Sequence, residues 1–117
     1  MAFQEGNFRY RDSHFGFNPF IGEEVVWEND RVIWAMNYYG MMTDTSVPAS
    51  DVYRFLQKAM QKIGAERPFR GPHEYHEGDF IYQDTSEGNV NQFSGEETIF
   101  FQNKQVYLLT YHGGKVG

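Results

Sequence analysis

The chain has 117 residues, of which 40% are hydrophobic and 18% aromatic, and its formal net charge is −6. This length gives room for one domain with a single core, and the aromatic content excludes a disordered chain. The acidic balance argues against a broad nucleic-acid-binding surface, and the lack of cysteine excludes a disulfide framework, a thiolate zinc site and a cysteine nucleophile.

The N-terminal third of the sequence predicts three short strands. Residues 7–12, 22–28 and 31–39 are rich in Val, Ile, Phe, Tyr and Trp and are separated by Gly, Asn and Asp, which is the composition of strands and their turns. Asn29 and Asp30 tolerate positive φ and suit a two-residue hairpin turn. This segment is therefore predicted to form a three-stranded antiparallel meander.

One amphipathic helix is predicted over about residues 50–64. Its apolar positions recur at helical spacing. They are Val52, Phe55, Leu56, Met60 and Ile63. Ser50 is the predicted N-cap, and Gly64 is the predicted stop before Pro68. The apolar stripe has to be buried, and the sheet is the surface available for it.

The C-terminal third predicts a second meander. Residues 79–84, 95–101 and 104–112 again combine aromatic and β-branched residues, and Gln102 and Asn103 form the predicted hairpin turn between the last two strands. The composition and spacing are those of the first meander.

The two meanders repeat the same sequence pattern. Residues 6–40 and 78–113 share Gly, Phe, Tyr and Asp at matching places once one extra residue is allowed in the second copy, so that Tyr38 matches Tyr111. Each copy is one supersecondary unit. The sequence therefore predicts an α+β fold for a single domain over residues 1–117. The fold is a duplicated three-stranded antiparallel meander of about six strands, related by a pseudo-twofold, with the helix between the copies packed on the sheet.

Nothing in the sequence indicates export or a membrane. The first residues, MAFQEGNFRYRD, lack the apolar run of a signal peptide, and no run of about 18 apolar residues occurs. We therefore predict a cytoplasmic protein.

Several segments resemble a family of small uncharacterised bacterial domains. They include YRDSHFG, GEEVVWENDRVIWAMNYYG, FLQKAM, FRGPHEYHEGDFIY and VYLLTYHGG, and the blocks WAMNYYG (34–40) and FRGP (69–72) are the most specific parts. Domains of this family occur alone or behind a helix-turn-helix segment of the XRE regulator type. The resemblance implies that a helix usually found before the first meander is missing here. It implies no reaction, cofactor or catalytic residue.

Four acidic residues stand at matching places of the two copies. Asp12 and Asp84 each follow a tyrosine by two residues at a predicted strand end, where aspartate commonly forms an Asx turn. The alternative is that the two carboxylates approach each other across the pseudo-twofold and form an acid–base dyad. Glu23 and Glu96 begin the second strands and are either solvated strand ends or part of the same site.

Three further polar residues are candidates for a site. Asn37 is predicted to be buried or half-buried, where it either pins the end of a strand or contacts a ligand. His112 ends the last strand where the first copy has Tyr39, and Arg70 either pairs with an acidic residue or binds an anionic group. The HEYH segment at 73–76 lacks a helical register and a third ligand, so no metal site is predicted there.

The sequence supports two hypotheses about function. It has no P-loop, dinucleotide-binding, nucleophile-elbow or zinc-protease motif. The first hypothesis is a non-catalytic small-molecule-sensing or interaction module linked to regulation, without a cofactor, whose aromatic residues line an apolar pocket with a few polar tips. The alternative is a small enzyme that uses carboxylates and histidine between the two repeats as acid and base. The candidate ligand-binding residues are Tyr10, Asp12, Glu23, Trp34, Asn37, Tyr38, Arg70, Asp84, Glu96, Tyr111 and His112.

An apolar sheet face that nothing in the chain covers would favour a homodimer. If the family's extra helix is missing, an apolar face with Val25, Trp27, Val32, Trp34 and Met36 is left uncovered, and soluble monomers seldom expose such a patch. A second copy of the chain is the predicted cover. The alternative is burial by the chain's own helix and loops. A third possibility for the function is a protein that binds a separately encoded regulator. Direct nucleic-acid or membrane binding is not predicted.

Overall fold

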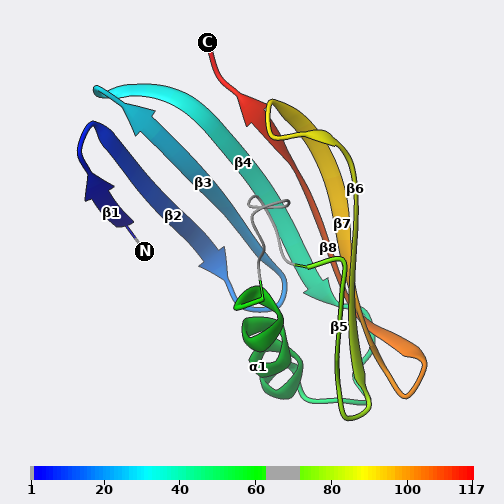
Figure 1. Cartoon of the computed structure of the whole chain (residues 1–117). Coiled ribbons are helices and arrows are strands. Elements are labelled where there is room, and N and C mark those ends of the chain that lie inside the picture. The colour runs from blue at the N-terminus through cyan, green and yellow to red at the C-terminus, as the bar shows by residue number, and fades with distance from the viewer. Residues whose placement is uncertain (1, 63–71) are drawn as a thin grey trace.

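The computed structural model describes residues 2–62 and 72–117, and in these residues eight strands and one helix make up the fold (Figure 1). The elements are β1 (Ala2–Glu5), β2 (Phe8–Gly16), β3 (Phe20–Glu28), β4 (Arg31–Met42), α1 (Ala49–Met60), β5 (Glu74–Glu77), β6 (Phe80–Asn89), β7 (Gln92–Phe101) and β8 (Lys104–Lys115). All the strands belong to one antiparallel sheet with the order β1-β2-β3-β4-β8-β7-β6-β5. β4 and β8 therefore lie at its centre, and β1 and β5 form its edges.

This architecture corrects the predicted fold class. Over the described residues the protein is mostly β, with eight strands in one sheet and a short helix, so the predicted α+β duplication of about six strands is wrong. The sequence pattern missed β1 and β5, whose residues AFQE and EYHE are almost all exposed and show no clean alternation of apolar and polar residues. Each half of the sheet is thus a meander of four strands, because a short edge strand precedes the three expected ones.

The two halves of the sheet, β1 to β4 and β5 to β8, have the same strand order and meet at β4 and β8. In this central pair Tyr38 lies directly opposite Tyr111, and Asn37 lies opposite His112. Because Tyr38 and Tyr111 occupy matching places in the two sequences, we infer that a pseudo-twofold axis passes between them, normal to the sheet.

The predicted hairpin turns are confirmed in both halves. Asn29 and Asp30 have φ values of 50° and 64°, and Gln102 and Asn103 have φ values of 50° and 67°. Positive φ at both central residues gives a turn whose twist matches that of the flanking strands. Asn29, Asp30 and Asn103 are of residue types that tolerate positive φ, and Gln102 adopts it without that preference.

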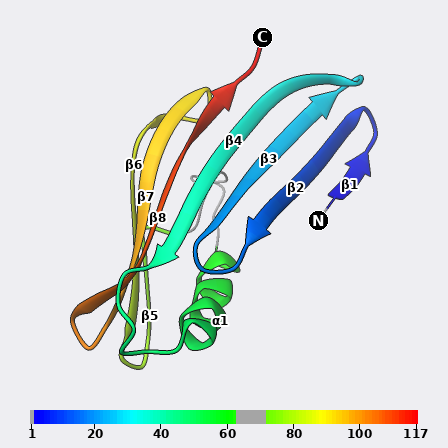
Figure 2. The same cartoon turned by 180° about the vertical axis from the view of Figure 1, so that it is seen from behind.

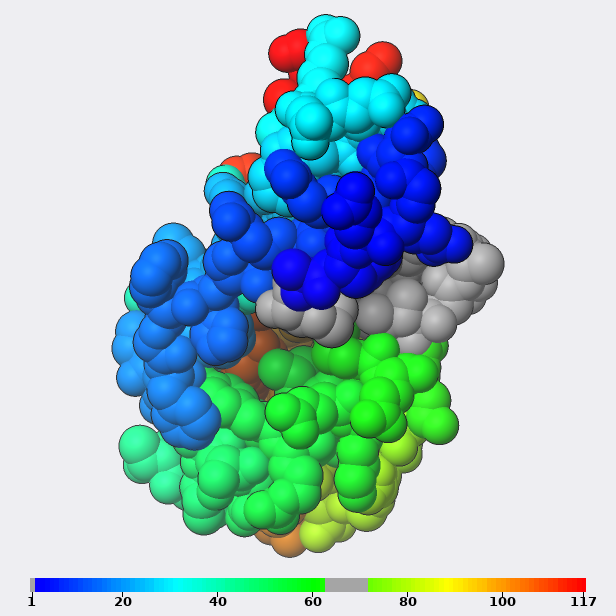
Figure 3. All heavy atoms as spheres, turned by 90° about the vertical axis from the view of Figure 1, so that its left-hand side faces the viewer, coloured from blue at the N-terminus to red at the C-terminus, as the bar shows by residue number. Residues whose placement is uncertain are grey.

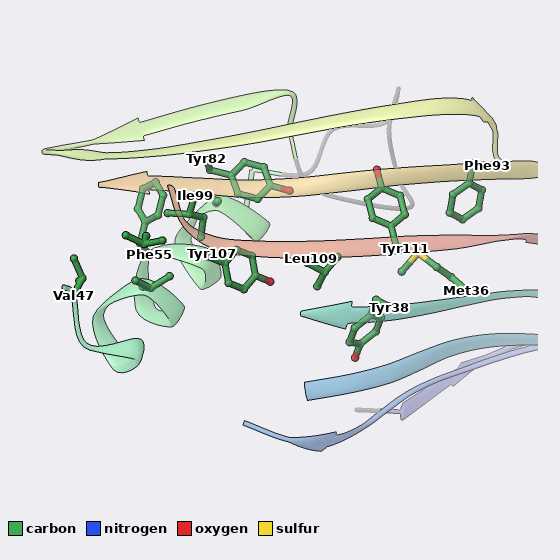
Figure 4. Close-up of a cluster of buried hydrophobic side chains, with 13 residues drawn as sticks. Met36, Tyr38, Val47, Phe55, Tyr82, Phe93, Ile99, Tyr107, Leu109 and Tyr111 are labelled. Atoms are coloured by element: carbon green, nitrogen blue, oxygen red, sulfur yellow. The ribbon is translucent and has the colours of Figure 1, made fainter. Parts of the chain in front are cut away.

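One face of the sheet, the inner face, carries α1 and the hydrophobic core. Figures 1 and 2 show α1 between the end of β2 and the edge strand β5. The core side chains come from β4, β6, β7, β8, α1 and the segment before α1 (Figure 4), and Tyr82, Ile99, Tyr107 and Leu109 are fully buried. Most of these residues belong to the second half, so the core lies to one side of the pseudo-twofold axis. The opposite face is called the outer face.

The observed helix is shorter than the predicted helix over about residues 50–64, and it begins one residue earlier, at Ala49. The predicted N-cap at Ser50 is wrong, because Pro48 takes that place and no side chain caps the first turn. Proline has a fixed φ and suits the start of a helix. The predicted stop at Gly64 lies outside the described residues. Within the described residues no helix is long and apolar enough to cross a bilayer.

The predicted apolar stripe of the helix is only partly confirmed. Val52 and Phe55 are buried in the core, whereas Leu56 and Met60 are half-buried. Ile63 lies outside the described residues. Leu56 therefore contributes less to the core than its central place in the stripe suggests.

α1 is attached to the second half of the sheet. The ring of Phe55 stacks on the rings of Tyr75 and Phe80, with centroid distances of 5.6 Å and 5.0 Å. Lys58 Nζ lies 2.6 Å from Glu77 Oε1, which adds an ion pair between the helix and β5. These contacts place α1 over β5 and β6, and Tyr53 connects the helix to Phe17 and Phe20 of the first half.

The bare face predicted from Val25, Trp27, Val32, Trp34 and Met36 does not exist as one surface. Trp34 and Met36 pair with residues of β3 that point to the inner face, while Val25 and Trp27 point to the outer face. Val25 and Met36 are also buried. The prediction failed because it combined Trp34 and Met36 of the inner face with Val25, Trp27 and Val32 of the outer face.

Candidate functional site

The candidate residues fall on two opposite faces of the sheet, because side chains alternate along each strand and cross-strand partners share a face. The inner face carries Tyr10, Asp12, Trp34, Tyr38, Asp84 and Tyr111. The outer face carries Glu23, Asn37, Glu96 and His112. Arg70 lies outside the described residues. The two aspartates of the enzyme hypothesis therefore lie on the face opposite to its two glutamates and its histidine.

In the first half of the inner face, two tyrosines donate hydrogen bonds to two carboxylates. Tyr38 Oη donates to Asp12 Oδ1 at 2.7 Å, and Tyr10 Oη donates to Glu24 Oε1 at 2.8 Å. Burial, followed by the contact with Glu24, raises the pKa of Tyr10 well above its ordinary range. Tyr10 is therefore a neutral donor at any physiological pH. We call these four side chains the first carboxylate cluster.

The second half repeats this arrangement. Tyr111 Oη donates to Asp84 Oδ1 at 2.7 Å, and Tyr82 Oη donates to the carboxylate of Glu97. Asp84 is 1% exposed and Glu97 is 0% exposed. A buried carboxylate requires hydrogen-bond donors to offset its lost hydration, and the tyrosines supply them. We call these four side chains the second carboxylate cluster.

The clusters correct both interpretations of the paired aspartates. Asp12 and Asp84 lie within β2 and β6, not in Asx turns, and β3, β4, β8 and β7 separate the two strands. Each aspartate is bonded to a tyrosine of its own half rather than joined to the other in a dyad. Glu24 and Glu97 were missed as partners. The signal for them was the repeated Gly-Glu-Glu, since the glutamate after Glu23 must point to the opposite face.

Two glycines allow the tyrosines to reach the aspartates. A Cβ atom at Gly22 would overlap the ring of Tyr38, and a Cβ atom at Gly95 would overlap the ring of Tyr111. Each ring therefore crosses the neighbouring strand at a glycine, and Tyr38 meets Asp12 on the next strand. Close approach of a side chain to the backbone explains why glycine stands at both places.

The first carboxylate cluster borders a cleft between α1 and the first half of the sheet, called the inner cleft. Its volume is about 610 Å³. Figure 3 shows the opening between the blue atoms of β2 and the green atoms of α1. The described residues that line it are Asp12, His14, Gly16, Phe17, Phe20, Tyr38, Tyr53, Leu56, Gln57, Met60 and Gln61.

Aromatic side chains fix the walls of the inner cleft. Tyr53 Oη donates to the carbonyl oxygen of Phe17 at 2.7 Å, and the two rings meet edge to face at 4.8 Å. The rings of Phe20 and Tyr53 also meet edge to face, at 5.8 Å, and Phe20 lies 6.1 Å from Tyr38. Burial raises the pKa of Tyr53, so its hydroxyl stays protonated as a donor. The helix and the sheet are thereby held apart at a defined distance.

A second hollow lies on the outer face, over β2, β3, β4 and β8, and has a volume of about 670 Å³. The side chains that give this outer hollow its chemistry are Arg11, Phe15, Ile21, Glu23, Asn37, Tyr39 and His112. Asn37 lies between Glu23 and His112 and is exposed, so its predicted burial is wrong. The prediction assumed that both faces of β4 are covered, whereas α1 covers the inner face only in part and the outer face not at all.

The described residues contain no group of three or more His, Cys, Asp or Glu side chains that could hold a metal ion. The inner cleft instead combines aromatic walls, a carboxylate and two glutamine amides. An apolar cavity with a few polar groups is typical of a small-molecule site.

The fold and its inner cleft define a small, mostly-β domain with a pseudo-twofold sheet. The model of the family described as "domain of unknown function (DUF5680)" matches residues 12–116, and the chain belongs to this family. The resemblance to an uncharacterised domain family is confirmed in this respect. No curated protein and no solved structure matches the chain.

Proposed function

We propose that the protein is a non-catalytic module that binds a small molecule in the inner cleft. The observation that carries this proposal is a cleft of about 610 Å³ whose walls include Phe20, Tyr38 and Tyr53 and whose side bears the half-buried carboxylate of Asp12. Sites for small molecules have volumes of about 300–1,000 Å³, and they combine apolar walls with a few placed polar groups.

The lining residues favour a flat ligand with an amino group. Among the described residues that line the cleft, Asp12 is the one acidic side chain, and these residues include no lysine or arginine. Aromatic faces also attract cations, because the ring quadrupole is negative above the ring plane. Gln57 and Gln61 offer amide donors and acceptors at the rim. A planar aromatic amine fits these features better than an aromatic carboxylate does.

The distribution of polar groups supports binding over catalysis. Asp12 and Asp84 lie on the inner face and Glu23, Glu96 and His112 on the outer face, so the aspartates cannot act with the other candidates on one substrate. On the outer face Asn37 stands between Glu23 and His112. The resemblance to domains that follow helix-turn-helix segments supports a sensing role linked to regulation. A cytoplasmic location and binding without a cofactor belong to the same proposal.

The proposal is tested first with a pair of ligands of opposite charge. Tryptamine and indole-3-acetate share a ring and differ in the charge of the side group. We expect millimolar tryptamine to raise the Tm of the protein in a concentration-dependent manner, because a ligand that binds the folded state stabilises it. Indole-3-acetate should give a smaller rise. An equal response to both compounds, or no response to tryptamine and related amines, contradicts the proposal.

A matched pair of helix variants localises the effect. Gln57 and Ser50 are both exposed on α1, but Gln57 lines the inner cleft and Ser50 does not. The variant Gln57→Trp should fill the opening and abolish the response to tryptamine. The variant Ser50→Trp should leave the response unchanged. A response that survives in Gln57→Trp places the binding elsewhere.

Self-association stays a prediction and rests on different residues from those first expected. Phe3 and Phe8, at the β1 edge, are 54% and 48% exposed. Exposed aromatic side chains at a sheet edge favour contact with a second copy or with a protein partner. Analytical ultracentrifugation at micromolar concentration tests the homodimer, and a single species of 13.7 kDa contradicts it.

A further inference from the structure

The outer face differs between the two halves of the sheet. In the first half Phe15, Ile21 and Tyr39 form one cross-strand row, and they are 76%, 50% and 43% exposed. The matching residues of the second half are Glu87, Ser94 and His112. Both halves have the same strand pairing, so the fold does not require an apolar row at this place. Apolar side chains that a sheet does not need and leaves in water mark a binding surface.

Two opposite charges lie on the same face, Glu23 next to this row and Arg11 one step farther along the sheet. Arg11 on β2 pairs with Val25, two residues from Glu23 on β3, so Arg11 and Glu23 are diagonal neighbours with Cα atoms about 7–8 Å apart. Both are exposed, and neither forms an ion pair with another described residue. The guanidinium of Arg11 lies 5.6 Å from the ring centroid of Trp27. Both charges are thus available to one ligand.

A polar row completes the outer hollow. Glu23, Asn37 and His112 lie directly opposite one another on β3, β4 and β8. The amide of Asn37 both donates and accepts, and the imidazole of His112 can do the same. The row is parallel to the apolar row, because it is displaced from it by two residues along each strand. A ligand in the outer hollow therefore meets a polar side and an apolar side.

We propose that the outer hollow binds a free α-amino acid with a large apolar side chain. Arg11 binds the carboxylate, since a guanidinium pairs with a carboxylate through two parallel hydrogen bonds. Glu23 accepts hydrogen bonds from the ammonium group. Phe15 and Tyr39 cover the apolar side chain. This site lies on the face opposite the inner cleft and is independent of the function proposed for that cleft.

Three related ligands test the assignment of the two charges. The ligands are L-phenylalanine, phenethylamine, which lacks the carboxylate, and 3-phenylpropionate, which lacks the ammonium group. In ¹H–¹⁵N NMR titrations of the whole chain, L-phenylalanine should bind about tenfold more tightly than either analogue. Its chemical-shift changes should centre on Asn37, Tyr39 and His112. Equal binding of the three ligands, or no change at tens of millimolar L-phenylalanine, overturns the proposal.

Variants of the charged residues sharpen the test. Arg11→Gln should weaken L-phenylalanine binding by about tenfold and leave phenethylamine binding unchanged, and Glu23→Gln should weaken L-phenylalanine and leave 3-phenylpropionate unchanged. Glu96 matches Glu23 in the second half, so Glu96→Gln is the control and should change nothing. All these positions are exposed, so the variants should fold. Losses of equal size for all ligands, or a loss in the control, overturn the assignment.

Discussion

The two carboxylate clusters contain the same residue types, two tyrosines, an aspartate and a glutamate, in two different environments. Asp84 and Glu97 are buried, whereas Asp12 and Glu24 of the first half are only half-buried. The two hydrogen bonds from tyrosine to carboxylate are nevertheless the same in both halves, and Tyr82 Oη also lies 3.5 Å from Asp84 Oδ2. α1 packs on the second half through Phe55 and borders the inner cleft of the first half through Leu56 and Gln57. The repeated sequence thus sets the same local chemistry in both halves, and the two copies differ in how deeply this chemistry is buried.

The edges of the two halves show the same contrast. Tyr75 and Phe80 stack on Phe55 of α1, whereas Phe3 and Phe8 occupy the matching places in the first half and are exposed. The ring of Phe3 stacks on Tyr10, 5.1 Å away, and no helix residue among residues 2–62 and 72–117 forms a ring contact with it. An aromatic pair at this edge is therefore a helix-docking surface in one half and an open surface in the other.

The largest expected effect comes from the helix contact. Phe55→Ala should destabilise the protein by about 3–5 kcal/mol, because it removes a buried ring and leaves a cavity between α1 and the sheet. Phe8 matches Phe80, the ring on which Phe55 stacks, and Phe8→Ala at the open edge should change the stability by about 0.5 kcal/mol or less. Urea denaturation measures both. Equal losses would show that the two edges are covered alike.

A smaller difference is expected between the clusters. Tyr111→Phe removes a donor from the buried Asp84 and should cost about 1–3 kcal/mol, while Tyr38→Phe removes a donor from the half-buried Asp12 and should cost about 0.5–1.5 kcal/mol. Water can reach Asp12 and replace part of the lost bond. The test is to measure the free energy of unfolding of both variants. A larger loss of stability in Tyr38→Phe than in Tyr111→Phe contradicts the comparison.

The smallest effect concerns the ion pair between α1 and β5. The hydrogen bond from Lys58 lowers the pKa of Glu77 below its ordinary value of 4.5. A lowered pKa in the folded state stabilises the protein above the ordinary pKa, and this stabilisation is lost as the pH falls through the lowered one. Glu77→Gln should therefore lower the denaturation midpoint slightly at pH 7 and not at pH 2.

The matching residue on β1 provides the control for this ion pair. Glu5 forms no ion pair with a described residue, so Glu5→Gln should leave the midpoint unchanged at both pH values. A pH-independent effect of Glu77→Gln would indicate that the ion pair does not hold the helix.

Several features of the fold follow from the sequence for clear physical reasons. Asn29 and Asp30 mark a turn because few other residues adopt positive φ without strain. The apolar stripe of α1 could be predicted because Val52 and Phe55 recur at helical spacing. The edge strands could not be recognised, because a strand exposed on both faces has no apolar alternation.

The site was harder to predict than the fold. Asp12 and Tyr38 were both candidates, but their hydrogen bond depends on a ring that crosses β3 at Gly22, which no spacing rule shows. Asn37 is exposed because its face of β4 has no cover, and cover is a property of the tertiary structure. The residue types therefore indicated which side chains belong to a site. Which side chains contact each other depends on the strand register and on the position of α1.

The central claim is that the first half, which α1 leaves open, binds the ligand. The most direct test is a ¹H–¹⁵N NMR titration with tryptamine. Chemical-shift changes should centre on His14, Tyr53 and Gln57 around the inner cleft. Ser86, which matches His14 in the second half, should not change. Changes that centre on the second half or on the outer face would contradict the account.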